Sequence, residues 1–177
     1  VMGGPIAAHL VRAGHTVTVF NRTLSRAHDW VAQHGGHAAA SPAQAVEGAE
    51  IVFCCVGNDD HVAQVVLSAD GALGAMAPGS VLVDHTTASA VIAREIFQIA
   101  VARGVVFLDA PASGGQGGAV DGSLSVMVGG RLEDFERVRP LFDTYARCAR
   151  LIGPAGSGHL AKISIQICIA GLLQGLS

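Results

Sequence analysis

EIVFCCV, at residues 50–56, is a short and almost continuous apolar run. A parallel strand in an α/β protein has this pattern, because helices cover both faces of the sheet. Similar runs recur along the chain as TVTVF (16–20), SVLVD (80–84), VVFL (105–108) and, more weakly, SVMV (125–128) and ARLI (149–152). The sequence therefore predicts six strands.

Segments with helical spacing of apolar residues separate these runs. The predicted helices cover 5–12, 23–34, a short helix opened by Ser41-Pro42, 59–67, 89–103 and 132–145. Regular alternation of strands and helices implies right-handed βαβ crossovers. We expect an α/β fold with a Rossmann-like, doubly wound, mostly parallel sheet and helices on both faces. The apolar stretch 163–177 predicts the start of a long further helix.

Composition excludes several classes of protein. Hydrophobic residues make up 50% of the chain and charged residues 14%, which is ample for a buried core. The net charge of -3, without basic clusters, argues against a nucleic-acid partner. We see no apolar run long enough to cross a bilayer and no signal peptide, so we expect a cytoplasmic protein without a membrane partner.

Cysteine and histidine give no sign of a metal site. The four cysteines (54, 55, 148 and 168) show no C-x-x-C spacing, and we interpret them as small buried hydrophobic residues in a reducing cytoplasm. The eight histidines are scattered, and we interpret them as surface or capping residues.

Val1-Met2-Gly3-Gly4-Pro5 has the form of a turn that leads into a helix. A dinucleotide fingerprint, G-x-G-x-x-G, joins a strand to a helix whose N-terminus meets the pyrophosphate. If Gly3 is the third glycine of that fingerprint, the first two glycines and their strand precede residue 1. The alternative is a plain Gly-Gly-Pro turn. We expect the sequence to be a fragment that lacks this strand and a partner for its last helix.

Asn21-Arg22-Thr23 follows the strand predicted at 16–20. The end of the second strand of such folds reads the adenosine ribose, where an acidic residue favours NAD. No acidic residue stands here, whereas the guanidinium of Arg22 suits a 2′-phosphate and Arg26 follows one turn later. We therefore favour NADP (NADPH) over NAD. The alternative is a solvated, charged helix start.

Ser113-Gly114-Gly115 lies just beyond the strand predicted at 105–108. Ligands of open α/β sheets gather at the carboxyl ends of strands, and a hydroxyl with free backbone N–H groups suits a carboxylate. The alternative is an ordinary Gly-rich loop.

Lys162 is the one lysine beside ten arginines, and it stands in an apolar helical stretch. Arginine does not release its proton near neutral pH, whereas a desolvated lysine does. A position that requires lysine in an arginine-using chain indicates proton exchange.

Together these motifs, with Asp84-His85-Thr86-Thr87, Met127-Val128-Gly129-Gly130 and Gly156 to Lys162, resemble the β-hydroxyacid dehydrogenase family. That family includes 3-hydroxyisobutyrate dehydrogenase and tartronate semialdehyde reductase, and is related to 6-phosphogluconate dehydrogenase. The resemblance implies an NAD(P)-dependent oxidoreductase that interconverts a β-hydroxy acid and its semialdehyde by hydride transfer.

The resemblance also implies roles for individual residues. Lys162 would be the catalytic acid/base, and Ser113, Gly114 and Gly115 would hold the substrate carboxylate. The cofactor-binding residues would be Met2, Gly3, Asn21, Arg22, Thr23, Val56 and Thr87, with the first two near the pyrophosphate and Thr87 on the nicotinamide side. No metal is implied.

The resemblance divides the chain into a dinucleotide-binding domain at 1–154 and, at 155–177, the start of an all-α domain that closes the substrate site. A homodimer or homotetramer is expected for the full-length protein. Family members usually carry Asn three residues after the lysine, where this sequence has Ile165, followed by Gln166. Gln166 lies one helical turn from Lys162 and could supply the amide that orients substrate.

Two alternatives share the same scaffold. One is an imine reductase, although such enzymes typically replace the lysine with Asp or Tyr. The other is a non-catalytic dinucleotide-binding protein, which would have no need of Lys162.

Overall fold

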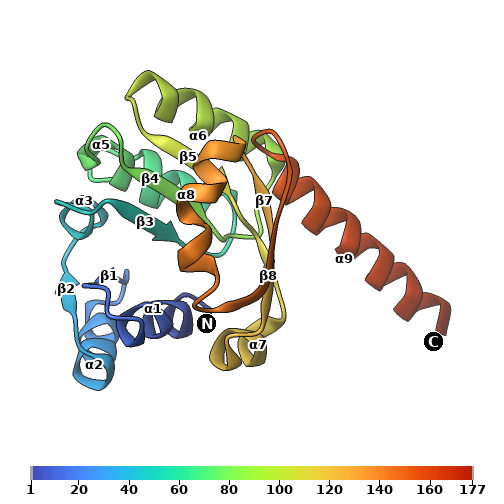
Figure 1. The fold of residues 1–177 in the computed structure, drawn as a ribbon, viewed down its shortest axis with the longest axis horizontal. Coiled ribbons are helices and arrows are strands. Elements are labelled where there is room, and N and C mark those ends of the chain that lie inside the picture. The colour runs from blue at the N-terminus through green and yellow to red at the C-terminus, as the bar shows by residue number, and fades with distance from the viewer. Residues whose placement is uncertain (1, 177) are drawn as a thin grey trace.

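A computed structural model describes residues 2–176, so Val1 of the N-terminal motif lies outside the described residues. The Rossmann-like prediction is confirmed, because helices cover both faces of a mostly parallel sheet (Figure 1). The long C-terminal helix extends away from this body.

The main sheet has six strands in the order β3-β4-β5-β7-β6, and β8 also pairs with β7. Their bounds are β3 (Ile51–Cys54), β4 (Val81–Asp84), β5 (Val106–Asp109), β6 (Ala112–Ser113), β7 (Leu124–Gly129) and β8 (Ala146–Gly153). The β3–β4, β4–β5 and β7–β8 pairs are parallel, whereas β7 runs antiparallel to β5 and β6.

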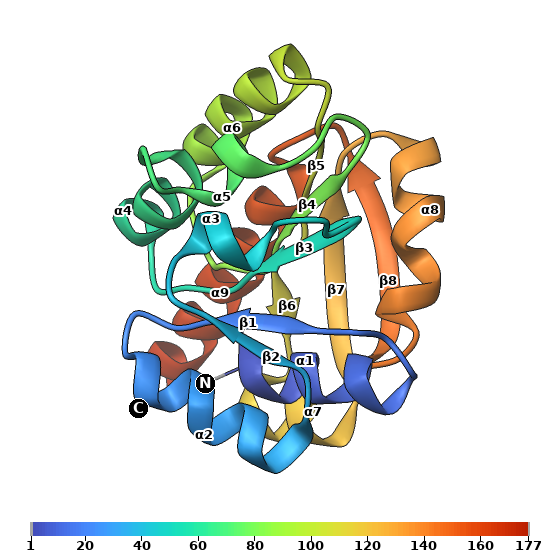
Figure 2. The same cartoon turned by 90° about the vertical axis from the view of Figure 1, so that its left-hand side faces the viewer.

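Two further strands, β1 (Thr18–Phe20) and β2 (His37–Ala39), form a separate parallel pair. Among the described residues no strand joins this pair to β3, which lies beside it in Figure 2. All four residues of β4 are buried, whereas the first three residues of β3 are only half-buried. The edge of the main sheet that faces the pair is thus less covered than its centre.

Helices pack on the sheet through two separate cores. The helices are α1 (Gly3–Arg12), α2 (Leu24–His34), α3 (Pro42–Ala45), α4 (Asp59–Val62) with its π-helical continuation η1 (Ala63–Leu67), α5 (Ala72–Ala75), α6 (Ala90–Ala102), α7 (Gly115–Asp121), α8 (Leu132–Phe142) and α9 (Ser157–Leu176). Val81 and Val83 of β4 face the core shared with α1 and α8, whereas Leu82 faces the core shared with η1, α5 and α6. This alternation is the period of two of a strand covered on both faces.

All six predicted strands are present, within a few residues of the expected bounds. Two short strands and two short helices were not predicted, namely β2, β6, α5 and α7. The segment after β5, for which an ordinary Gly-rich loop was the alternative interpretation, therefore contains β6, which pairs with β7, and opens α7.

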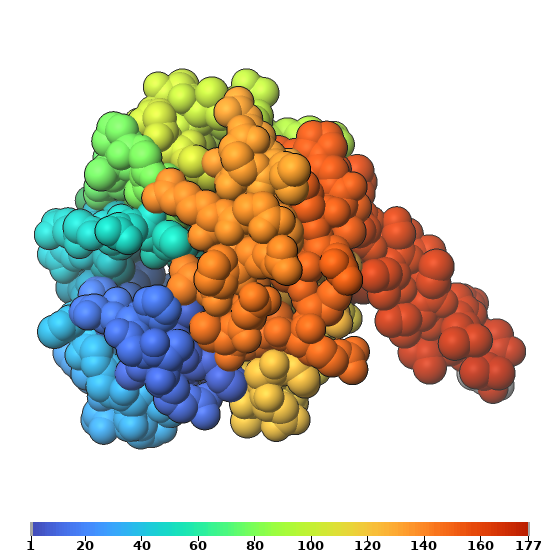
Figure 3. All heavy atoms as spheres, viewed as in Figure 1, coloured from blue at the N-terminus to red at the C-terminus, as the bar shows by residue number. Residues whose placement is uncertain are grey.

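The last helix differs most from its prediction. We expected a helix that begins near Lys162, whereas α9 begins at Ser157 and runs for 20 residues. By length and composition α9 could cross a membrane, so the expectation that no segment is long enough is wrong. This is weak evidence for a membrane, because core helices of other proteins meet the same criterion. Figure 3 shows α9 projecting from the rest of the molecule.

Candidate active site at the carboxyl ends of the strands

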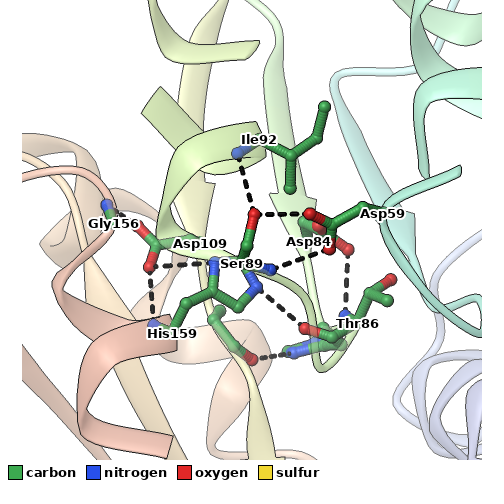
Figure 4. Close-up of polar contacts among 10 residues, drawn as sticks. Asp59, Asp84, Thr86, Ser89, Ile92, Asp109, Gly156 and His159 are labelled. Atoms are coloured by element: carbon green, nitrogen blue, oxygen red, sulfur yellow. Dashed lines mark hydrogen bonds and ion pairs between the residues drawn. The ribbon is translucent and has the colours of Figure 1, made fainter. Parts of the chain in front are cut away.

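The loops that follow β3 and β4 are joined at the carboxyl edge of the sheet. The Val56 N–H donates to Thr86 Oγ1 (3.0 Å), and the Thr86 N–H donates to Asp84 Oδ1 (2.9 Å). Farther along, the carboxylate of Asp59 accepts hydrogen bonds from both the N–H (2.8 Å) and the hydroxyl of Ser89 (Figure 4). These bonds bring Val56 near the segment that carries Thr87, whose side chain is exposed.

The N-terminus of α1 lies against the loop after β3. Met2 is the residue before the helix, and Gly3 is its first residue. A Cβ atom on Gly3 would lie 3.3 Å from Cβ of Cys55, tighter than ordinary packing. A glycine at this position allows the close helix–strand approach that a dinucleotide fingerprint requires. Gly3 therefore fits a bound dinucleotide.

The side chain of Lys162 reaches the segment that precedes Ser113. Its Nζ donates to the carbonyl oxygen of Ala112 (2.9 Å), 50 residues away in the sequence. The side chain is half-buried, and the desolvation that results lowers the pKa of the ammonium. The structure thus brings together the residue expected to exchange a proton and the loop expected to bind substrate.

Ser113 ends β6, and Gly114 and Gly115 begin the turn into α7. Gly114 (φ +132°) and Gly115 (φ +62°) both have positive φ, a conformation that side chains with a Cβ rarely adopt. Both glycines are exposed, so their backbone is accessible.

Asp109, at the end of β5, binds the first turn of α9 (Figure 4). Its Oδ1 accepts from the Gly156 N–H (2.7 Å) and its Oδ2 from the His159 N–H (3.0 Å). Nε2 of His159 in turn bonds the carbonyl oxygen of Thr86 (2.8 Å). Both the Asp109 and His159 side chains are fully buried. The helix that carries Lys162 is therefore fixed to the ends of β4 and β5.

The histidine prediction is wrong at two positions, because His85 and His159 are buried rather than on the surface. His85 bonds the carbonyl oxygen of Ala110 through Nδ1 (2.5 Å) and the hydroxyl of Tyr145 through Nε2 (2.9 Å). Its ring stacks on Phe53 with centroids 5.7 Å apart. Burial lowers the pKa of His85 to about 4, so the ring is neutral near pH 7.

Asp84 is also fully buried, and its Oδ2 has no hydrogen-bond partner within residues 2–176. Burial raises the pKa of this carboxyl group, and the neighbouring Asp109 adds to the effect. Sequence motifs had included Asp84 and His159 without giving them a role, and Asp109 was not singled out. For the two aspartates, a polar residue at the end of a buried strand was the available signal.

The other predicted site residues lie on the surface. Asn21, Arg22 and Thr23 are exposed at the end of β1, where Asn21 Oδ1 accepts from the Thr23 N–H (2.9 Å). Gln166 is exposed on α9, as is its neighbour Ile165. Among the described residues, the Gln166 side chain makes no hydrogen bond to the substrate loop.

The cysteines are free thiols, but they are not all buried as expected. Cys54 is buried, two are half-buried, and Cys168 is exposed on α9. Within the described part of the chain, no three metal-binding side chains of His, Cys, Asp or Glu lie together.

Known proteins are similar to this chain in both sequence and fold. An uncharacterized oxidoreductase of Shewanella frigidimarina is 54% identical over 177 residues, which cover 100% of this chain and 61% of that protein. The 3-hydroxyisobutyrate dehydrogenase of Pseudomonas aeruginosa is 39% identical over 174 residues, covering 98% of this chain and 58% of that protein.

A solved structure of 3-hydroxyisobutyrate dehydrogenase from Mycobacterium tuberculosis with L-serine matches with a TM-score of 0.89 at 34% identity. The match covers 96% of this chain and 57% of that one. The chain thus spans about three fifths of the length of the relatives it matches. Residues 1–153 match the family described as the NAD binding domain of 6-phosphogluconate dehydrogenase, and the chain belongs to that family.

Proposed function

We propose that this chain is the cofactor-binding part of an NAD(P)-dependent β-hydroxyacid dehydrogenase, which interconverts a β-hydroxy acid and its semialdehyde. The observation that carries the proposal is the 2.9 Å hydrogen bond from Lys162 Nζ to the carbonyl oxygen of Ala112. It holds a partly desolvated amine beside Ser113, at the edge of the sheet where ligands of this fold bind.

The nicotinamide supplies the hydride, and the protein supplies orientation and a proton. In the reducing direction the ammonium of Lys162 donates its proton to the carbonyl oxygen of the semialdehyde, whose carbon would receive the hydride of the reduced nicotinamide. In the oxidising direction the neutral amine takes the proton of the hydroxyl group, and the carbinol carbon would give its hydride to the oxidised nicotinamide. Because a neutral amine still has two N–H bonds, Nζ can keep its hydrogen bond to Ala112 in both states while its lone pair faces the substrate.

Ser113, Gly114 and Gly115 are proposed to bind the substrate carboxylate. The first N–H groups of α7 have no acceptor inside the helix, and Gly114 precedes its first residue. Gln166 would add an amide from the next turn of α9.

Met2 and Gly3 are proposed to lie near the pyrophosphate, with Val56 and Thr87 on the nicotinamide side. NADP is proposed over NAD because Arg22 is exposed and free of acidic neighbours in the segment 20–24. The hydroxyl of Thr23 makes no capping bond to α2, which leaves it available to the same phosphate.

Residues 155–177 are proposed as the start of an all-α domain that closes the site. The exposed side chains of Ile167, Leu172 and Leu173 on α9 support this division, because such an apolar surface is normally covered. We propose that the full-length protein is a cytoplasmic homodimer or homotetramer.

The test is turnover of a panel of semialdehydes with NADPH by the full-length protein and by its Lys162→Ala and Lys162→Arg variants. We expect both variants to lose roughly 100- to 10,000-fold in kcat while their Kd for NADPH changes little. Lys162→Arg is the matched control, since it keeps a cation but cannot exchange the proton. Retained turnover in either variant would exclude Lys162 as the acid/base. NADPH binding without turnover of any semialdehyde would favour a non-catalytic dinucleotide-binding protein, and turnover of imines alone an imine reductase.

A further inference from the structure

Asp109 and His159 form a buried connection between the end of β5, the end of β4 and the first turn of α9. We propose that His159 is a positioning residue. Held by Asp109 and bonded to Thr86, it fixes Lys162 relative to the loop after β4, which carries Thr87 on the proposed nicotinamide side. The inference rests on the proposed function of Lys162, but its own evidence is the set of contacts around His159.

The hydrogen-bond geometry determines which ring nitrogen of His159 carries a proton. Nε2 lies 2.8 Å from the carbonyl oxygen of Thr86, and a carbonyl oxygen can only accept. Nε2 therefore carries the hydrogen and donates it to the carbonyl oxygen of Thr86, the residue before Thr87. Nδ1 lies on the opposite side of the ring, 3.5 Å from Asp109 Oδ2, so the ring spans from β5 to the loop after β4.

Glycines surround the carboxylate of Asp109. A Cβ atom on Gly129 would overlap this carboxylate, and one on Gly158 would lie 2.9 Å from Oδ2. Gly156 has a positive φ of +90° and donates its N–H to Oδ1. Gly129 and Gly158 thus leave room for the buried carboxylate, and Gly156 supplies one of the N–H groups that it binds. This contact accounts for Gly129 and Gly158 structurally, without any ligand.

His159 and Lys162 are three residues apart on α9, so they lie on neighbouring turns of one face. His159 reaches the loop after β4, and Lys162 reaches Ala112, which follows β5. A shift of the helix at His159 would change both the position of Nζ and its desolvation. Catalysis is sensitive to such shifts, since a displacement of about 1 Å can cost roughly 100-fold in rate.

The experiment compares His159→Leu and His159→Gln in the full-length enzyme. Leucine removes the donor, whereas the amide nitrogen of glutamine can take the place of Nε2 and restore the bond to Thr86. We expect His159→Leu to lower kcat roughly 10- to 100-fold with a much smaller change in the KM for hydroxy acid. The acid limb of the kcat profile for oxidation should move to higher pH, because Lys162 becomes better solvated. His159→Gln should recover most of kcat and return the acid limb to its wild-type pH.

Tyr145→Phe is the matched control, because it removes a buried hydrogen bond to His85 without touching α9. It should lower stability but leave the pH limb in place. Loss of kcat in His159→Leu without a shifted limb, or no recovery in His159→Gln, would overturn the positioning role. Unchanged kinetics in His159→Leu, in an enzyme that Lys162→Ala inactivates, would refute this inference and leave the proposed function intact.

A readout independent of activity is amide hydrogen exchange of the segment 153–162. His159→Leu should accelerate exchange there, and His159→Gln should not, because the first turn of α9 depends on this connection. Equal protection in the wild type and in His159→Leu would contradict the proposal whether or not the protein has the proposed activity.

Discussion

Lys162 Nζ and the carbonyl oxygen of Ala112 lie 2.9 Å apart, although 50 residues separate them in the sequence. The bond places the amine where desolvation lowers its pKa. The proposed acid/base and the proposed carboxylate-binding loop thus belong to one local structure, built from β6 and α9.

The first prediction concerns the pH dependence of hydroxy-acid oxidation. The neutral form of Lys162 is the base, so the rate should rise with pH and level off above its pKa. Because desolvation lowers this pKa, the rise should be centred below the ordinary value of a lysine. The measurement is kcat against pH for the wild type and for Lys162→Arg, which should show no such limb. If the rise in kcat with pH persists in Lys162→Arg, the titrating group is not Lys162.

A second prediction concerns the choice of cofactor. Arg22→Ala should raise the Kd for NADPH roughly 10- to 100-fold and leave that for NADH nearly unchanged, since only NADPH carries the 2′-phosphate. Fluorescence titration with both cofactors measures this. Arg147→Ala on β8, which also removes one exposed arginine, is the matched control and should change neither Kd. An equal rise in the Kd for NADPH and for NADH in Arg22→Ala would contradict NADP selectivity.

Buried strands and amphipathic helices could be predicted from sequence because their patterns are strong. β4 is buried at every position, and its run SVLVD indicated a strand covered on both faces. α7 (Gly115–Asp121) gave no such signal: three of its seven residues are glycines, which disfavour helix. Its position depends on tertiary packing, including the fully buried Ala119. β6 has only two residues, too few for any period.

The candidate site was predictable only in part, because local motifs indicate single residues but not which distant segments meet. Motifs pointed to Lys162 and Ser113 separately, but only the fold places α9 against β6. His159 was interpreted as a surface or capping residue, because no local pattern distinguishes a histidine that bonds residues 73 positions away. Likewise, α9 begins earlier than its apolar stretch because Asp109, from β5, binds its first N–H groups.

A third prediction concerns stability and His85. Its pKa is about 4 in the fold against an ordinary value of 6.5, so the unfolded chain binds the proton more readily. Stability from this group is complete above pH 6.5 and is lost as pH falls toward 4, by up to roughly 3 kcal/mol. Urea unfolding of the wild type and His85→Phe across this range measures it.

His85→Phe should be less stable at pH 7, because Tyr145 loses its partner, but its free energy of unfolding should fall less between pH 6.5 and 4. Parallel pH curves for the two proteins would show that the other histidines and the carboxylates account for the whole dependence.

The last prediction concerns Gly158, in the first turn of α9. A Cβ atom there would overlap the carbonyl oxygen of Met127 and lie 2.8 Å from that of Asp109. Both are backbone atoms of strands in the main sheet, so α9 rather than the sheet must move. Gly158→Ala should therefore lower the free energy of unfolding by about 3 kcal/mol and reduce kcat through the displacement of Lys162. Gly74→Ala in α5 is the matched control, because a Cβ at Gly74 meets nothing within 4 Å. It should be neutral or stabilising by roughly 0.5–1 kcal/mol, as expected for alanine in a helix. If the two variants unfold at the same urea concentration, the first turn of α9 does not pack against the backbone of β5 and β7.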